Sequence, residues 1–238
     1  MHKDQNPAAG RVMDYLEIAS RYILLNFFWI STVFPVAFVF FLGLRQFFGL
    51  HNFPWVAALV PIAITSPAMG GLFYAANQLA HGRDGGFVDY WQGMKIYFWP
   101  SYRWVTLNLG VAFLFSVNIW FYGNAPWEFA PYIKILFIAG AAFWAAIQTY
   151  TFPFMIEQEK PSIKTALRNS FLAVARFPLR SFGFLVVVVS IAFLSAYLYY
   201  LPWVIITVSF LAYLMNKNTL TVLEKFIAMQ QAEEKSPK

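Results

Sequence analysis

The stretch YILLNFFWISTVFPVAFVFFLGL, residues 22–44, contains no charged side chain and decides the fold class. It is 23 residues long, and about 20 helical residues are enough to cross the roughly 30 Å of hydrocarbon in a bilayer. Four further charge-free stretches follow it, at residues 52–80, 104–127, 135–156 and 181–216. The sequence therefore predicts an all-α polytopic membrane bundle, with one membrane domain that covers residues 1–238.

The last charge-free stretch is long enough for two membrane spans. It contains 36 residues, about 54 Å as a helix, and Pro202 lies within it between tyrosines and Trp203. Tyrosine and tryptophan favour the membrane–water interface, so we expect a tight turn there. This makes six transmembrane helices, paired as three hairpins. The expected spans are about 22–44, 54–80, 103–123, 132–156, 181–200 and 202–223, followed by a cytoplasmic tail at 224–238.

The basic residues predict the orientation of these spans. Of the 17 Lys and Arg residues, 15 fall in the N-terminal segment, the loops after the second and fourth spans, and the tail. Only Arg45 and Lys134 lie in the other loops. Cytoplasmic loops carry an excess of Lys and Arg, so we expect both termini in the cytoplasm. The net charge is +6, and the basic residues lie at the expected membrane borders. This placement favours contact with the lipid bilayer and argues against nucleic-acid binding.

Short amphipathic segments precede alternate spans. Residues 87–98 and 161–177 repeat apolar side chains at helical spacing, and residues 9–20 form a similar stretch before the first span. Such segments are typical of helices that lie in the cytoplasmic interface. The predicted unit is therefore an interfacial amphipathic helix followed by a membrane hairpin, used three times.

Small residues predict which spans meet. Ala63, Pro67, Gly71 and Ala75 recur at four-residue steps in the second span, and the fourth span carries Ala141 and Ala145. Small side chains let helix backbones approach closely in lipid, so we expect these two stripes to touch.

Several motifs of this chain resemble the YesL family, which consists of bacterial multi-span membrane proteins of unknown function. Four short runs carry the resemblance: Asn26–Trp29, Phe34–Pro35, Pro67–Tyr74 and Phe87–Trp91. Ser66 stands where the family usually has a glycine. The resemblance covers about residues 20–120. It implies a multi-pass protein of the bacterial cytoplasmic (inner) membrane, associated with carbohydrate uptake or utilisation, and it supplies no catalytic residue.

The side chains that usually carry chemistry are sparse. The chain has no cysteine and three histidines, which lack the spacing of metal ligands. We find no ionisable residue deep within the first five spans, where a membrane enzyme would need one. The loop at 81–86 lacks the Gly-Lys-Ser/Thr of a phosphate-binding loop, and we expect its Asp84 to cap the following helix. The sequence thus predicts no enzyme activity, no metal and no cofactor.

Two functions stay open on these grounds. A non-enzymatic accessory or scaffold protein, attached to a membrane transport complex or another membrane protein, would use its buried amides to tie helices together. A small permease for an uncharged solute or a lipid-like molecule would use the Pro67–Gly71 kink of the second span. A polar cavity that reaches Asn77 and Gln148 would favour transport, whereas a sealed apolar core would favour a scaffold. The candidate cavity or packing residues are Asn26, Ser66, Pro67, Gly70, Gly71, Asn77, Asn108 and Gln148.

Overall fold

The computed structural model describes residues 7–47 and 64–235, and within these ranges it contains helices and turns but no strand. The helices are α1 (Pro7–Phe47), α3 (Ser66–Ala80), α4 (Phe87–Ile96), α5 (Phe98–Asn124), α6 (Ala130–Ile156), α7 (Ile163–Arg176), α8 (Pro178–Tyr197), the π-helix η2 (Trp203–Thr207) and α9 (Val208–Lys235). The predicted all-α class is confirmed for this part of the chain.

Four of the described helices are long and apolar enough to cross a membrane. They contain the segments Leu16–Gly43, Phe98–Asn124, Ala130–Ile156 and Pro178–Tyr197. Of the expected second span, the structure describes the 15 residues of α3, while residues 48–63 with His51 and Pro54 lie outside the described ranges. The expected sixth span falls on η2 and α9, and α9 carries Lys217, Glu224 and Lys225. The structure therefore supports four candidate spans.

One expected boundary is wrong. The segment 9–20 is not a separate interfacial helix, because α1 runs without a break from Pro7 to Phe47. No proline or glycine occurs between Arg11 and Phe34, so nothing in the sequence ends the helix at the membrane border. The described part of the expected tail, residues 224–235, is helical, since α9 continues to Lys235.

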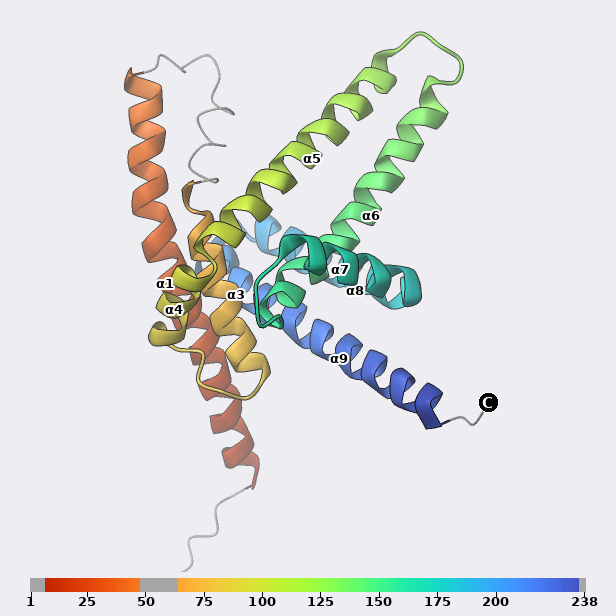
Figure 1. The fold of residues 1–238 in the computed structure, drawn as a ribbon. Coiled ribbons are helices and arrows are strands. Elements are labelled where there is room, and N and C mark those ends of the chain that lie inside the picture. Colours follow the sequence, from red (N-terminus) through yellow and green to blue (C-terminus); the bar gives the residue numbers. More distant parts are fainter. Residues whose placement is uncertain (1–6, 48–63, 236–238) are drawn as a thin grey trace, which may run out of the picture.

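Helix α3 is the centre of the fold. It packs against α1, α4, α5, α6 and α9, and most of its residues are buried. The core around it includes Leu72 and Ala76 of α3 together with Tyr150 and Met155 of α6, all fully or almost fully buried. Figure 1 shows α3 between α1 and α9, at the level where most of the elements meet. The short helix α3 thus packs against most of the other helices of the described chain.

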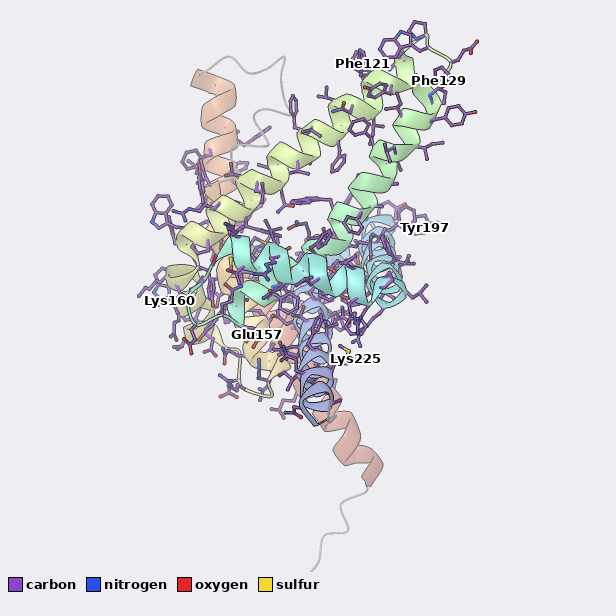
Figure 2. All side chains as sticks on the ribbon, turned by 45° about the vertical axis from the view of Figure 1, so that its right-hand side comes forward. Phe121, Phe129, Glu157, Lys160, Tyr197 and Lys225 are labelled. Carbon is purple, nitrogen blue, oxygen red and sulfur yellow. The ribbon has the colours of Figure 1, made fainter. Side chains whose placement is uncertain are left out.

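Helices α5 and α6 form a hairpin that leaves this core. They extend side by side away from the other helices in Figure 1, and α5 exposes large apolar side chains along most of its length. Figure 2 shows Phe121 and Phe129 at the tip of the hairpin, far from Glu157 and Lys160, which follow the other end of α6. Exposed aromatic side chains also lie at the start of α5, at Phe98 and Trp99, so both ends of the hairpin carry residues that favour a membrane–water interface.

The two short helices predicted after the second and fourth expected spans are present as α4 and α7. The hydroxyl of Ser162 accepts a hydrogen bond from the Thr165 N–H at the start of α7. At the start of α4 the carboxylate of Asp89 accepts from the Gly86 N–H at 3.2 Å. Asp84 does not cap α4, contrary to the sequence prediction, because its carboxylate pairs with Arg21 instead.

The glycines of α3 face α4 and not α6. A Cβ atom added at Gly71 would lie 2.6 Å from the carbonyl oxygen of Tyr90, and one added at Gly70 would lie 2.9 Å from Cβ of Tyr97. The contact is reciprocal, because a Cβ at Gly93 of α4 would lie 2.5 Å from Cβ of Tyr74. The predicted packing of Gly71 against the alanines of α6 is therefore wrong.

Helices α3 and α6 do contact each other, but through larger side chains. The rings of Phe73 and Phe152 lie 4.9 Å apart between their centroids. Ala141 and Ala145 are only partly buried. The small residues of α3 are thus used at the crossing with the short helix α4, where the backbones come closest.

Candidate functional site

Asn26 holds the π-helix against α1. Its carboxamide is fully buried and donates to the carbonyl oxygens of Trp203 at 2.9 Å and Val204 at 2.7 Å. Its Oδ1 accepts from the Ser209 N–H at 3.1 Å. Backbone groups that leave the regular helical pattern need other partners when they are buried in an apolar region. The side chain of Asn26 provides three such hydrogen bonds, so its role is to hold these helices together.

Two buried amides, Asn77 and Asn216, lie near the C-terminal end of α6 beside the partly exposed side chains of His81 and Glu157. We call these four residues the inner polar cluster. Asn77 donates to Oε1 of Glu157 at 2.5 Å and to Oδ1 of Asn216 at 3.2 Å. Asn216 in turn donates to the carbonyl oxygens of Phe73 at 3.3 Å and Ala212 at 2.8 Å. The cluster joins α3, the end of α6 and α9.

The imidazole of His81 closes this cluster. Its Nδ1 lies 3.0 Å from the carbonyl oxygen of Asn77, which can only accept, so Nδ1 carries a proton. Nε2 lies 3.9 Å from Oε2 of Glu157, close enough for an ion pair when the ring is doubly protonated. Both ring nitrogens thus face groups of the protein itself.

Two further groups border the inner polar cluster. The hydroxyl of Tyr97 donates to the carbonyl oxygen of Ile156 at 3.3 Å, and burial raises the pKa of Tyr97 to about 12, with smaller contributions from Tyr74 and Glu157. Lys217 Nζ lies 3.5 Å from the carbonyl oxygen of Ala80. The tyrosine therefore stays neutral at physiological pH.

The amides of Asn108 and Gln148 join α5 to α6. Oε1 of Gln148 accepts from the indole N–H of Trp104 at 2.8 Å and from Asn108 at 3.2 Å. Oδ1 of Asn108 accepts from the indole N–H of Trp144 at 3.0 Å. Nδ2 of Asn108 also donates to the Trp104 carbonyl at 2.9 Å. These bonds are of the kind that tie membrane helices together.

An aromatic layer separates these two sets of amides, and it consists of Phe73, Trp104 and Phe152. Their ring centroids lie 4.9 to 6.4 Å apart. Along α6, Phe152 lies between Gln148 and Glu157, and it is fully buried. The structure thus brings Asn108 and Gln148 together, but it keeps them apart from the inner polar cluster.

The remaining candidates lie at the start of α3. Pro67 occupies the first turn of the helix, where its missing N–H costs nothing, and the chain turns at Thr65 just before it. The hydroxyls of Ser66 and Ser101 are buried, and among the described residues neither has a hydrogen-bond partner. Gly70 packs beside Ser101, so this region is a helix crossing. The carbonyl of Ala63, expected to be freed by Pro67, lies outside the described residues.

Sequence reasoning missed that His81, Glu157 and Asn216 meet at Asn77. Each of the three looked like a border residue, because each ends or interrupts an apolar stretch. The available signal was that three polar side chains sit at the cytoplasmic ends of three different expected spans. Helix ends at the same membrane surface are near one another, so such residues are candidates for one cluster.

Two cavities open beside the inner polar cluster. One of about 350 Å³ is lined by residues that include Glu17, Arg21, Arg83 and Tyr213. The other, of about 510 Å³, is lined by residues that include His81, Lys217, Thr221 and Glu224. Both contain charges of both signs. Within the ranges 7–47 and 64–235, no group of three His, Asp or Glu side chains is placed to hold a metal ion.

Comparison with known protein families, with curated proteins and with solved structures finds no match for this chain. The resemblance to the YesL family therefore stays a prediction from the motifs in the sequence.

Proposed function

We propose that this chain is a non-enzymatic integral membrane protein of the YesL type, which acts as an accessory or scaffold for another membrane protein. The aromatic layer of Phe73, Trp104 and Phe152 is the observation that carries the proposal. A transport path for a polar solute needs a continuous polar route. Here rings in edge-to-face and tilted contact lie between the two sets of amides, and the amides bond to neighbouring helices.

The finer topology is part of the same proposal. The four apolar helices are compatible with a multi-pass membrane protein. We propose that residues 48–80 supply a further span, and that η2 and the first half of α9 supply a sixth. The termini and the inner polar cluster would then face the cytoplasm of a bacterial cell, and α4 and α7 would lie at the cytoplasmic surface. Support comes from the 15 basic residues in the segments assigned to that side.

The partner we propose is a membrane complex for carbohydrate uptake, an expectation that rests on the YesL resemblance. The exposed apolar sides of α5 and α6 offer a surface for such a complex. Side chains such as Phe113, Trp120, Tyr132 and Leu136 are exposed along the hairpin.

A permease is the second candidate. The observation in its favour is the pair of buried hydroxyls at Ser66 and Ser101, which lie beside the first turn of α3 with no partner among the described residues. An uncharged solute would need such groups on its route. Close packing at Gly70, where an added Cβ would lie 2.5 Å from the Ser101 hydroxyl oxygen, leaves little space beside this pair.

One experiment separates the two functions, and it uses the absence of native cysteine. Gln148→Cys is made in the native background and in a Phe152→Ala background. Both are treated in membranes with a small hydrophilic thiol reagent, and Glu159→Cys serves as the accessible control. For a scaffold we expect Cys at 148 to resist labelling until Phe152 is shortened. Rapid labelling at 148 with Phe152 intact would favour the permease and refute the sealed core.

A further inference from the structure

Positively charged side chains lie where α7 ends, α8 begins and α9 passes them. Arg180 Nε donates to Oδ1 of Asn218 on α9 at 3.0 Å. Seven residues further along α9, the ammonium of Lys225 lies 5.7 Å from the centroid of the Phe177 ring. Phe177 is also the residue that precedes α8. The two contacts place both cations beside the N-terminus of α8.

A third cation continues the same line. The guanidinium of Arg176, in the last turn of α7, lies 4.0 Å from the sulfur of Met229. Residues 218, 225 and 229 are spaced by seven and four, so they lie on one face of α9. We call the group formed by Arg176, Arg180, Asn218 and Lys225 the basic corner.

No carboxylate neutralises the basic corner among the described side chains. The ion pairs among the described residues lie elsewhere: Arg21 pairs with Glu17 and Asp84, and His81 pairs with Glu157. Glu224, which adjoins Lys225 in sequence, lines the cavity of His81 instead. Cations along one helix face that have no ion-pair partner among the described side chains favour the binding of an anion.

The backbone and one amide add donors to the corner. The first N–H groups of a helix have no partner within the helix and carry partial positive charge, and those of Leu179 and Arg180 are in this position in α8. Nδ2 of Asn218 also has no hydrogen-bond partner among the described residues, although Asn218 is only 9% exposed. Buried amide hydrogens are nearly always bonded, so a missing acceptor is expected here.

The position of the corner indicates the source of the anion. It lies at the first turn of α8, which is a candidate span, and Leu179 there is 91% exposed. Val186 and Val189 continue an exposed apolar surface along α8. A ligand with a phosphate at Arg180 and hydrocarbon along α8 would satisfy both features. Phosphate also matches the hydrogen-bonding geometry of guanidinium groups.

We propose that the basic corner binds the phosphate of an anionic phospholipid headgroup. The proposal depends on the membrane location in the proposed function and not on the scaffold role. It assigns Arg180 and Lys225 to the phosphate, with Arg176 at its edge, and Asn218 holds Arg180 in place. It would also anchor α7 and α9 to the bilayer surface through the bound lipid.

The test uses the full chain, purified in a mild detergent and titrated with palmitoyl-oleoyl phosphatidylglycerol, with phosphatidylcholine as the zwitterionic comparison. Bound lipid is counted by native mass spectrometry. Arg180→Gln with Lys225→Gln should weaken phosphatidylglycerol binding by at least about tenfold, since each cation near the headgroups adds to the attraction. Lys95→Gln with Lys164→Gln removes the same charge elsewhere and should leave the affinity unchanged. Equal binding by the two double variants would overturn the site.

Two further measurements make the result definite. Lys225 is exposed, so Lys225→Gln alone should fold normally and still weaken binding about fivefold; unchanged binding would count against the proposal. Inorganic phosphate is then added at constant ionic strength. Displacement of phosphatidylglycerol by millimolar phosphate would show that the corner takes free phosphate, which would overturn the lipid as its ligand. A labelled Gln148→Cys would refute the scaffold role without affecting these measurements.

Discussion

Ser209 of α9 donates its backbone N–H to the side chain of Asn26 in α1, and its hydroxyl donates a second hydrogen bond to the same helix. Oδ1 of Asn26 accepts from the Ser209 N–H at 3.1 Å, and the Ser209 hydroxyl donates at 2.8 Å to the carbonyl of Tyr22, one turn before Asn26. The first and last described helices of the chain are thereby connected in the buried interior. Any change at either residue should affect how the C-terminal helix is seated.

Asn26→Ala should destabilise the protein, because it leaves the carbonyls of Trp203 and Val204 and one N–H without their partner. We expect a loss of about 2 kcal/mol, from the cost of buried unsatisfied groups. Thermal unfolding in detergent measures it. Asn118→Ala is the matched control, since Asn118 is bonded to the carbonyl of Leu114 in its own helix and should change little. A similar loss in both variants would contradict the assigned role of Asn26.

Gly71→Ala and Gly93→Ala should each lower the folded yield, because a new Cβ at either position would overlap α4 or α3. Overpacking of this kind costs about 1–3 kcal/mol. Gly183→Ala is the control, since a Cβ there meets nothing within 4 Å. The measurement is the monodisperse fraction in size-exclusion chromatography. Full yield of Gly71→Ala would mean that α3 and α4 are not packed as described.

Glu157→Ala should weaken the junction of α3 with the end of α6, because Asn77 loses its shortest hydrogen bond. Glu157→Gln keeps an oxygen that can accept and should retain most of the stability. Glu159 is exposed, so Glu159→Ala provides a control of equal size. We expect the order native, Gln, Ala in midpoint temperature. If Glu157→Ala unfolds at the native temperature, the inner polar cluster does not stabilise the bundle.

Alkaline pH should destabilise the fold through Tyr97. An unfolded tyrosine has a pKa near 10, and burial raises the pKa of Tyr97 to about 12. The folded state therefore binds the proton more tightly, so its stabilising contribution is complete below about pH 10 and is lost as the pH rises toward 12. Tyr97→Phe should flatten the decline in unfolding temperature between pH 9 and 11. An unchanged slope would show that Tyr97 ionises as easily in the folded protein.

Single cysteines should report the orientation. With six spans, Cys at positions 95, 160 and 225 should label from the cytoplasmic side, and Cys at 124 from the outside. If only α1, α5, α6 and α8 cross the membrane and the N-terminus is cytoplasmic, position 124 lies inside and position 160 outside. Labelling by a membrane-impermeant thiol reagent in intact cells and in broken membranes distinguishes the two topologies.

Sequence patterns predicted a large part of the fold because lipid constrains secondary structure strongly. Every backbone group in hydrocarbon must be bonded within the chain, so long charge-free stretches had to be helices. The helices α5, α6 and α8 lie within a few residues of their expected spans. The predicted break at Pro202 is also present, with positive φ at Tyr199 and Tyr200 in the turn. The helix boundary expected between residues 20 and 22 is absent, because a helix can continue from water into lipid without a break.

For the candidate residues, the sequence predicted the kind of role better than the contact partner. Buried amides were expected to bond helices together, and Asn26, Asn108 and Gln148 do so. Gly71 was matched to the wrong helix, because a small-residue stripe indicates a close approach but does not identify its partner. Glu157 was assigned to a span border, and its contact with Asn77 crosses 80 positions in sequence.

The sequence by itself determined that the chain is helical, where its apolar stretches lie and how its charges divide among the loops, because these properties follow from local composition and hydrogen-bonding needs. Only the tertiary structure decided that α3 is the centre, that α4 packs over its glycines, that aromatic rings separate the two sets of amides and that three cations line one face of α9 beside the start of α8. Those contacts join residues far apart in sequence, and lipid is equally favourable to every apolar helix face. The choice of neighbours therefore came from shape, from backbone approach at small residues and from the pairing of a few buried amides.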